Sequence, residues 1–344
     1  MKKYFIFFFL ISSLYIESDA YFSSTKNITY NALGVTGLIY TPSAETHEEK
    51  SVFFTFNKNE IWKLGTITVT PFNWLEASYF YYRPDDLYWG SAVGLYLDKG
   101  FNVKLSYKPK IRNLPNFAIG LDDFAGTGQF TREYIATTFP IKSTKISFGI
   151  GWGKYAGKSS FKNPLSFIGE EIEFRPSGFS NLGGTPEYGK WFRGDASVFG
   201  GLEWSIPNSK GLKFKIELDP YDYLQFSCCG EGKGPNTDSL RKKDSKINLG
   251  ISFPLNDYGN IDLAFVKGNT ISLSFSFGIT ADRNNIKRKK FEPKIEKTNF
   301  NTTKKESFYR DLLHNLNLNN IYLQTADLKD NNISITIDSP DLRN

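Results

Sequence analysis

The sequence predicts an all-β protein, an antiparallel transmembrane β-barrel of roughly 12–14 strands with a small C-terminal α+β extension. Three observations predict this fold class. Between about residues 50 and 280, apolar and polar residues alternate with period two, as in strands with one apolar face. The connections between these strands alternate between short turns and long loops. Aromatic residues form 16% of the chain although its mean hydropathy is −0.37, so much apolar surface coexists with much polar surface.

The alternation is clearest near the end of this region, where Ile271, Leu273, Phe275, Phe277 and Ile279 are separated by serines and a glycine. We expect the apolar set to face lipid and the alternate set to line a hydrated lumen, because charges are costly only on the lipid face. The candidate lumen-facing residues are Lys104, Glu217, Ser272, Ser274 and Ser276. Further strands are expected at 35–41, 51–57, 65–71, 74–83, 91–97, 115–122, 132–139 and 258–266.

The connections divide into two kinds. Tight turns are expected at 98–100, 207–210 and 256–259, whereas 154–193 and 221–244 are long connections. Short turns on one rim and long loops on the other are typical of membrane barrels. The alternative is a soluble sandwich in which the aromatic residues fill the core.

The N-terminus predicts a cleavable signal peptide over residues 1–20. Lys2 and Lys3 precede an apolar run, and Ser18-Asp19-Ala20 offers a small-residue cleavage site. The run is short for a spanning helix, so an uncleaved anchor is the lesser alternative. No cysteine follows it, so we expect no lipoprotein anchor. Later residues contain no apolar run of spanning length, so a membrane form must be a barrel, in the outer membrane of a Gram-negative bacterium.

The pattern changes after the barrel region, which we place at 21–280. Residues 281–306 form a basic linker, and 307–344 predict a small α+β segment on the periplasmic side. The linker is interpreted as solvated, or else as a contact for an acidic polymer or anionic headgroups. The net charge of +6 is otherwise spread out, and we expect no nucleic-acid binding.

We expect no enzyme, because no catalytic, cofactor-binding or metal-binding set emerges. The two histidines, His47 and His314, are far apart in sequence. Cys228 and Cys229 are adjacent and lack metal-ligand spacing, and the sequence leaves their role open. A carboxylate pair from Asp122-Asp123 and Glu133, as glycoside hydrolysis would need, is the lesser alternative.

Several segments, taken in order, resemble a known family. They are 34–44, 71–77, 120–128 with Glu133-Tyr134, 199–204 and 267–270. The series resembles the YjbH-like outer-membrane proteins associated with exopolysaccharide and capsule production, and covers about 34–280. The most specific match is Gly120-Leu-Asp-Asp-Phe-Ala-Gly-Thr-Gly128. The family-motif residues in this chain are Asp123, Gly126, Thr127, Gly128, Glu133 and Tyr134.

This resemblance implies a non-catalytic barrel in exopolysaccharide or capsule export or assembly. The partners it implies are outer-membrane lipid and polysaccharide. Family members are about twice as long and carry a second barrel-like half, so a separately encoded second half or export machinery is a further expected partner. The alternatives are a general porin or small-solute channel, and a surface structural or adhesive barrel using loop 154–193.

Overall fold

A computed structural model describes most of the barrel region and the C-terminal segment. The described residues are 28–89, 96–111, 114–128, 130–157, 160–176, 184–224, 231–233, 235–255, 258–281, 305–318, 321–329 and 332–338. The expected signal peptide, the two cysteines and nearly all of the basic linker lie outside them. The chain divides into two compact units, 1–281 and 282–344.

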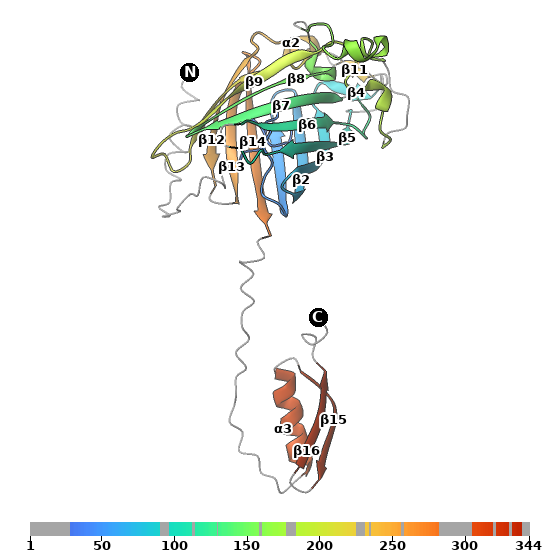
Figure 1. The fold of residues 1–344 in the computed structure, drawn as a ribbon, viewed down its shortest axis with the longest axis vertical. Helices are drawn as coiled ribbons and strands as arrows, with labels where there is room; N and C mark the ends of the chain where they lie inside the picture. The colour runs from blue at the N-terminus through green and yellow to red at the C-terminus, as the bar shows by residue number, and fades with distance from the viewer. Residues whose placement is uncertain are drawn as a thin grey trace. The chain divides into compact units, whose positions relative to one another are not determined.

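The first unit is a closed antiparallel barrel of 12 strands, which confirms the predicted fold class (Figure 1). Each strand pairs with its neighbours along the chain, and β1 closes the barrel by pairing with β14 from Ser51–Thr280 to Lys58–Leu273. The barrel strands are β1 Ser51–Lys58, β2 Trp62–Phe72, β3 Leu75–Pro84, β5 Asp98–Tyr107, β6 Asn116–Asp122, β7 Arg132–Ile141, β8 Thr144–Gly151, β9 Ser197–Ser205, β10 Lys213–Leu218, β12 Ile247–Pro254, β13 Gly259–Val266 and β14 Thr270–Thr280.

The alternation in sequence becomes an alternation between the inside and the outside of the barrel. Successive side chains of a strand point to opposite faces of the sheet. In β14, Phe275 is 38% exposed on the outer face, whereas Ser276 is fully buried inside. Exposed apolar side chains on the outer face include Phe54, Phe56, Ile67, Phe101, Phe117, Ile135, Phe148, Val198, Leu249, Phe265 and Leu273. The barrel is therefore apolar outside and largely polar inside, the reverse of a soluble protein.

Glycines on the inner face make room for large aromatic rings. Gly120 lies opposite Tyr134 in the ladder, and Gly149 lies opposite Phe199. A Cβ added at either glycine would lie within 2.5 Å of the ring of its partner. These pairs fill part of the interior between β6 and β9 and bury both rings.

The long connections gather at one rim, as predicted, although that rim also carries the short connections 59–61 and 267–269. The short-turn rim carries the connections 73–74, 142–143 and 206–212, and both Ser51 and Thr280 lie there. The long-loop rim carries 123–131, 152–196 and 219–246. Its short elements are β4 Leu87–Trp89, paired with β11 Glu231–Lys233, helix α2 Thr237–Arg241, and the 3-10 turns η1 Gly153–Tyr155, η2 Ser166–Ile168, η3 Glu170–Ile172 and η4 Tyr188–Lys190. In Figure 1, α2, β4 and β11 gather at one end of the barrel.

Two local predictions are wrong. Residues 35–41 are not a barrel strand; they lie inside the barrel, where their amides bond to interior side chains rather than to a neighbouring strand. Residues 98–100 are not a turn; they begin β5, and Gly100 serves close packing against the Phe80 ring instead. Of the strand expected at 91–97, residues 91–95 lie outside the described part of the chain.

The second unit is a small α+β fold. Helix α3 Lys305–Leu318 contacts β15 Tyr322–Lys329, which pairs with β16 Asn332–Asp338 in an antiparallel hairpin. Phe308 is buried on the helix. Among the described residues, no helix is long and apolar enough to cross a membrane.

The closure seam can be tested with a disulfide. Phe54 and Phe277 lie directly opposite each other across the seam, where opposed Cα atoms lie about 4.5–5.5 Å apart, within disulfide range. In a background with Cys228→Ser and Cys229→Ser, Phe54→Cys with Phe277→Cys should oxidise to a cross-linked form that migrates faster on a denaturing gel. The diagonal pair Phe54→Cys with Ile279→Cys should not, and cross-linking of the diagonal pair alone would contradict the register.

Candidate functional site

The interior of the barrel is occupied by residues 28–47, which we call the plug. Its side chains are almost all buried, with Val35 at 2% exposure and Thr41 at 0%. The plug ends at the short-turn rim, where Thr46 donates to the Asn73 carbonyl. It folds back on itself through the bridges Tyr30–Thr36 and Gly37–Pro42. The Asn31 side chain accepts from two plug amides and holds this bend.

Glu217 on β10 is the main hydrogen-bond acceptor for the plug backbone. Its carboxylate accepts the backbone N–H groups of Ile39, Tyr40 and Thr41 at 2.8, 2.9 and 2.8 Å. It also accepts the Thr41 hydroxyl at 2.8 Å and the Asn248 amide at 2.9 Å. A carboxylate can accept about four hydrogen bonds, so this buried group is satisfied mainly by the plug.

A second contact between the barrel wall and the plug is made by a buried ion pair of Lys104 and Glu76. Their charged atoms lie 3.0 Å apart, and both side chains are 1% exposed. Glu76 accepts the Thr36 amide at 2.9 Å, and Lys104 donates to the Thr36 carbonyl at 3.2 Å. Each charge of the pair therefore binds the same plug residue.

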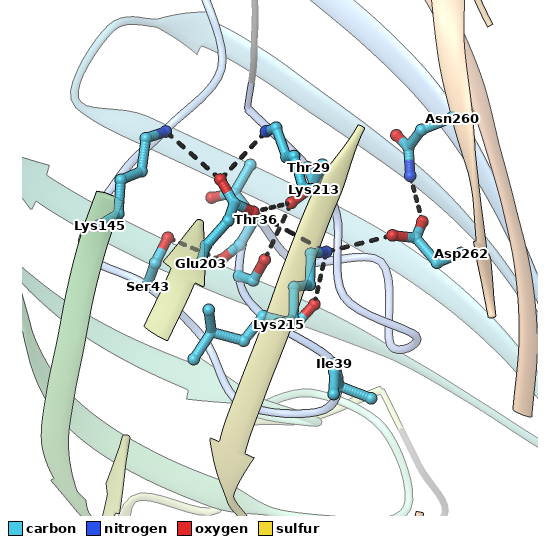
Figure 2. Close-up of polar contacts among 12 residues, drawn as sticks. Thr29, Thr36, Ile39, Ser43, Lys145, Glu203, Lys213, Lys215, Asn260 and Asp262 are labelled. Carbon is cyan, nitrogen blue, oxygen red and sulfur yellow. Dashed lines mark hydrogen bonds and ion pairs between the residues drawn. The ribbon is translucent and has the colours of Figure 1, made fainter. Parts of the chain in front are cut away.

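Glu203 lies at the centre of a third group of charges, drawn in Figure 2. Lys213 approaches it at 3.0 Å, and Lys145 and Lys215 each at 3.9 Å. Three plug residues join this group. Thr29 donates to Glu203 at 2.7 Å, Lys215 donates to the Leu38 carbonyl at 2.9 Å, and Lys145 pairs with Glu45 at 2.7 Å. Lys215 also pairs with Asp262 at 3.2 Å.

The three predicted serines of β14 also face the interior. Ser272 accepts the Tyr40 hydroxyl at 3.0 Å and the Asn57 amide at 2.8 Å. Ser274 accepts from Asn57 at 2.9 Å, and Ser276 bonds Thr55 at 3.0 Å. With Lys104 and Glu217, all five candidate residues are thus buried inside the barrel, and the space they face is filled by protein.

The family-motif residues build the connection between β6 and β7. Asp123 adopts φ 53°, accepts the Phe130 amide at 2.9 Å and packs against Gly126. Burial, reinforced by the nearby Asp98 carboxylate, raises the pKa of Asp123 well above its usual value. Thr127 donates to Asp98 at 2.7 Å, and the Gly128 carbonyl accepts the Thr131 hydroxyl. The motif therefore shapes a folded loop over the long-loop end of the lumen.

The carboxylates considered for hydrolysis lie in separate ion pairs. Asp122 binds Arg132 at 2.6 Å, and Glu133 binds Arg175 at 2.7 Å. Tyr134, the last motif residue, is buried edge-on against Phe199. Within the described ranges, no three His, Cys, Asp or Glu residues are grouped to hold a metal ion.

Sequence reasoning missed the plug and the charged partners Glu76, Glu203, Lys213 and Lys215. Alternation signals only which face of a strand a residue takes. The partners depend on register: Glu76 lies opposite Lys104, and Glu203 lies opposite both Lys145 and Lys215. A charged residue at an inward position in each of several strands was the signal that could have indicated them.

These features define a class: a closed barrel with an apolar outer face and a polar interior filled by its own N-terminal segment. Residues 29–344 match the family described as "Exopolysaccharide biosynthesis protein YbjH", and the chain belongs to that family. It is similar to a protein of Escherichia coli (strain K12) named "Uncharacterized lipoprotein YjbH", with 29% identity over 258 residues. That match covers 73% of this chain but 34% of the relative, so the chain spans about a third of the relative's length.

A similarity to a solved structure is weaker. The structure titled "Unveiling the Mechanism Behind the in-meso Crystallization of Membrane Proteins" aligns at 10% identity and a TM-score of 0.31. The alignment covers 68% of this chain and 86% of the other. A TM-score of 0.31 is too low to indicate a shared fold.

Removing the Glu217 carboxylate should release the plug. Glu217→Ala leaves three consecutive buried amides without their acceptor, which we expect to cost about 3 kcal/mol or more of stability. Glu217→Gln keeps one acceptor oxygen and should cost less. Thermolysin cleavage within residues 28–47 and the thermal midpoint in detergent would report the change. Glu171→Ala, at a carboxylate whose side chain is 86% exposed, is the matched control; equal effects at both sites would contradict the assignment.

The buried His47 at the end of the plug should make the free energy of unfolding depend on pH. His47 bonds Ser51 at 3.0 Å and packs on the Phe53 ring at 4.4 Å. Burial, and secondarily Lys108, lowers its pKa from 6.5 to about 4. The unfolded chain therefore gains a proton at a higher pH than the folded chain, and stability falls as pH drops from 6.5 towards 4, by about 3 kcal/mol.

The measurement is the thermal midpoint of the wild type and of His47→Gln across this pH range. The variant removes the titrating group, so its midpoint should fall less steeply with acid than that of the wild type. Parallel curves would show that His47 does not contribute.

Proposed function

We propose that this chain is a non-enzymatic outer-membrane β-barrel that acts in exopolysaccharide or capsule export or assembly. The observation that carries the proposal is the inverted polarity of a closed barrel in a chain that belongs to this family. The family description supports a role with exopolysaccharide, and the apolar outer face of the barrel supports a location in a membrane. The proposal assigns no chemical step to any residue.

The membrane location is argued from the outer face. Apolar side chains exposed around the whole barrel form a belt much larger than the few hundred Å² that soluble proteins tolerate. Aromatic residues lie at strand ends on the short-turn rim: Phe72 stacks on Trp74, and Tyr107 and Trp204 are exposed near the ends of β5 and β9. Aromatic rings of this kind favour the interface between lipid and water. Outer-membrane lipid is therefore the first proposed partner.

The filled interior argues against a general porin. A porin needs a continuous wet channel, whereas here Glu217, Lys104 and Glu203 are each bound to the plug. A polymer could use this lumen only if the plug gave up those contacts. The proposal therefore favours a dedicated role in polysaccharide handling over free diffusion of small solutes.

The orientation follows from the two rims. In outer-membrane barrels the short turns face the periplasm and the long loops face outward. Thr280 ends β14 at the short-turn rim, which supports the proposal that the C-terminal unit is periplasmic. A second barrel-like half, or export machinery, is a further proposed partner.

Substitution on the outer belt tests the proposal. Phe275→Arg places a charge on the lipid face, at a cost of about 2–4 kcal/mol near the bilayer midplane. We expect less heat-modifiable barrel in the outer-membrane fraction and less surface polysaccharide. Phe167→Arg, at a phenylalanine that is 82% exposed on a long loop, is the matched control and should leave both unchanged.

Two outcomes would count against the proposal. Equal membrane assembly of both variants would argue against lipid on this face. A large, steady conductance of the wild type in planar bilayers would favour the porin instead, because it requires an open lumen.

A further inference from the structure

The short-turn rim of the barrel is unevenly charged. Three consecutive connections on this rim, 108–115, 142–143 and 206–212, join β5 to β6, β7 to β8 and β9 to β10. In sequence they contain no aspartate or glutamate, but they carry Lys108, Lys110, Arg112, Lys142 and Lys210. Over the whole chain, 42 basic residues are nearly balanced by 36 acidic ones. The excess of positive charge is therefore a local feature of this part of the rim.

Four of these cations lie in the described part of the chain, and all four are exposed: Lys108, Lys110, Lys142 and Lys210. We call them the basic arc. Two carboxylates near the same rim are already paired with other lysines, Glu45 with Lys145 at 2.7 Å and Glu49 with Lys50 at 3.1 Å. Glu49 also precedes β1, which β2 and β3 separate from β5. The rim itself therefore does little to compensate the charge of the basic arc.

Turn geometry does not account for two of the lysines. Lys142 and Lys210 have φ angles of 52° and 54°, in the left-handed region that glycine and asparagine adopt at lower cost. For a two-residue turn such as 142–143, Asn-Gly is the favoured sequence. What lysine adds at such a position is a charge on a long, flexible side chain. The charge is thus a property that the turn itself does not require.

Exposed apolar side chains lie beside the basic arc. In the connection 108–115, Ile111 is 68% exposed and Leu114 is also exposed. Tyr107, Ile141 and Trp204 are exposed at or near the ends of β5, β7 and β9. Cations next to exposed apolar and aromatic side chains are typical of segments at the interface between lipid and water. An acidic polymer in water would match the lysines but would leave these apolar side chains in water.

The basic arc also borders the apolar outer belt. Phe101, Phe117 and Phe148 are exposed on the outer faces of β5, β6 and β8, three of the strands that the arc connects. A lipid whose acyl chains pack on this belt would place its headgroup at the strand ends. Lysine side chains can reach such a headgroup while their methylene groups stay on apolar surface.

We propose that the basic arc binds the anionic headgroups of phospholipids in the periplasmic leaflet of the outer membrane. The inference rests on the proposed function, because the short-turn rim faces the periplasm only in the proposed orientation. It adds the class of lipid and the leaflet. Phosphatidylglycerol represents this class, since its phosphate carries one negative charge. A lysine close to an anionic headgroup is worth about fivefold in affinity.

Native mass spectrometry of the full chain tests this selectivity. The protein is released from tetraethylene glycol octyl ether micelles that contain equal amounts of phosphatidylglycerol and phosphatidylcholine with matched acyl chains. The headgroups differ in mass, so the two bound lipids are counted separately. The wild type should retain phosphatidylglycerol over phosphatidylcholine by about fivefold or more, the factor that one lysine supplies.

The arc variant combines Lys110→Gln, Lys142→Asn and Lys210→Asn. Asparagine tolerates the left-handed region, so both turns should be kept and heat-modifiable gel mobility should match the wild type. This variant should retain the two lipids about equally. Lys142→Asn alone should give an intermediate ratio.

The control variant removes the same net charge from the long-loop rim. It combines Lys162→Gln, Lys233→Gln and Lys242→Gln, at lysines whose side chains are 72%, 50% and 70% exposed. It should keep the wild-type ratio. An equal loss of selectivity in the control and the arc variant would show that net charge, rather than the basic arc, sets the ratio, and would overturn the proposal.

Equal retention of both lipids by the wild type, or a wild-type ratio in the folded arc variant, would also overturn it. An excess of trigalacturonate, a soluble acidic oligosaccharide, should leave bound phosphatidylglycerol in place. Its displacement would assign the basic arc to an acidic polymer instead. Equal retention of both lipids together with normal outer-membrane assembly would remove only the headgroup selectivity, whereas equal assembly of Phe275→Arg and its control would count against the membrane barrel itself.

Discussion

Polar groups enclosed by a barrel must find hydrogen-bond partners, and in this protein the plug supplies many of them. Closure through β1 and β14 puts Glu76, Glu203 and Glu217 out of reach of bulk water. Burying such charges costs several kcal/mol per ion unless each is paired and bonded. The plug backbone provides amides for Glu217 and Glu76 and carbonyls for Lys104 and Lys215. The barrel and the plug therefore stabilise one another.

The same constraint limits how the lumen could open. Moving the plug would strip Glu217 of three backbone amides, so an opening event needs another set of donors in their place. A polyhydroxylated chain is chemically able to provide donors and acceptors along its whole length. Hydroxyl groups of a polysaccharide could thus replace the plug amides as hydrogen-bond donors to Glu217, so a filled lumen is compatible with a role in handling a polysaccharide.

Much of the barrel wall could be predicted because each strand records its two faces locally. Phe275 and Ser276 differ in exposure because neighbouring side chains point to opposite sides of a sheet. The errors at 35–41 and 98–100 have one origin. Apolar residues and glycines were assigned by local pattern, whereas Val35 serves interior packing and Gly100 serves close approach to Phe80.

The sequence by itself determined the all-β class, the two faces of the strands, the two kinds of connection and the family resemblance of the loop around Asp123. Tertiary structure decided that the lumen is occupied, that Glu203 meets three lysines, and that Asp122 pairs with Arg132 beside aromatic rings. The physical reason is the separation in sequence between the residues that each feature involves. Alternation is a property of adjacent residues, whereas Thr41 and Glu217 are 176 positions apart and meet only when closure and register bring them together.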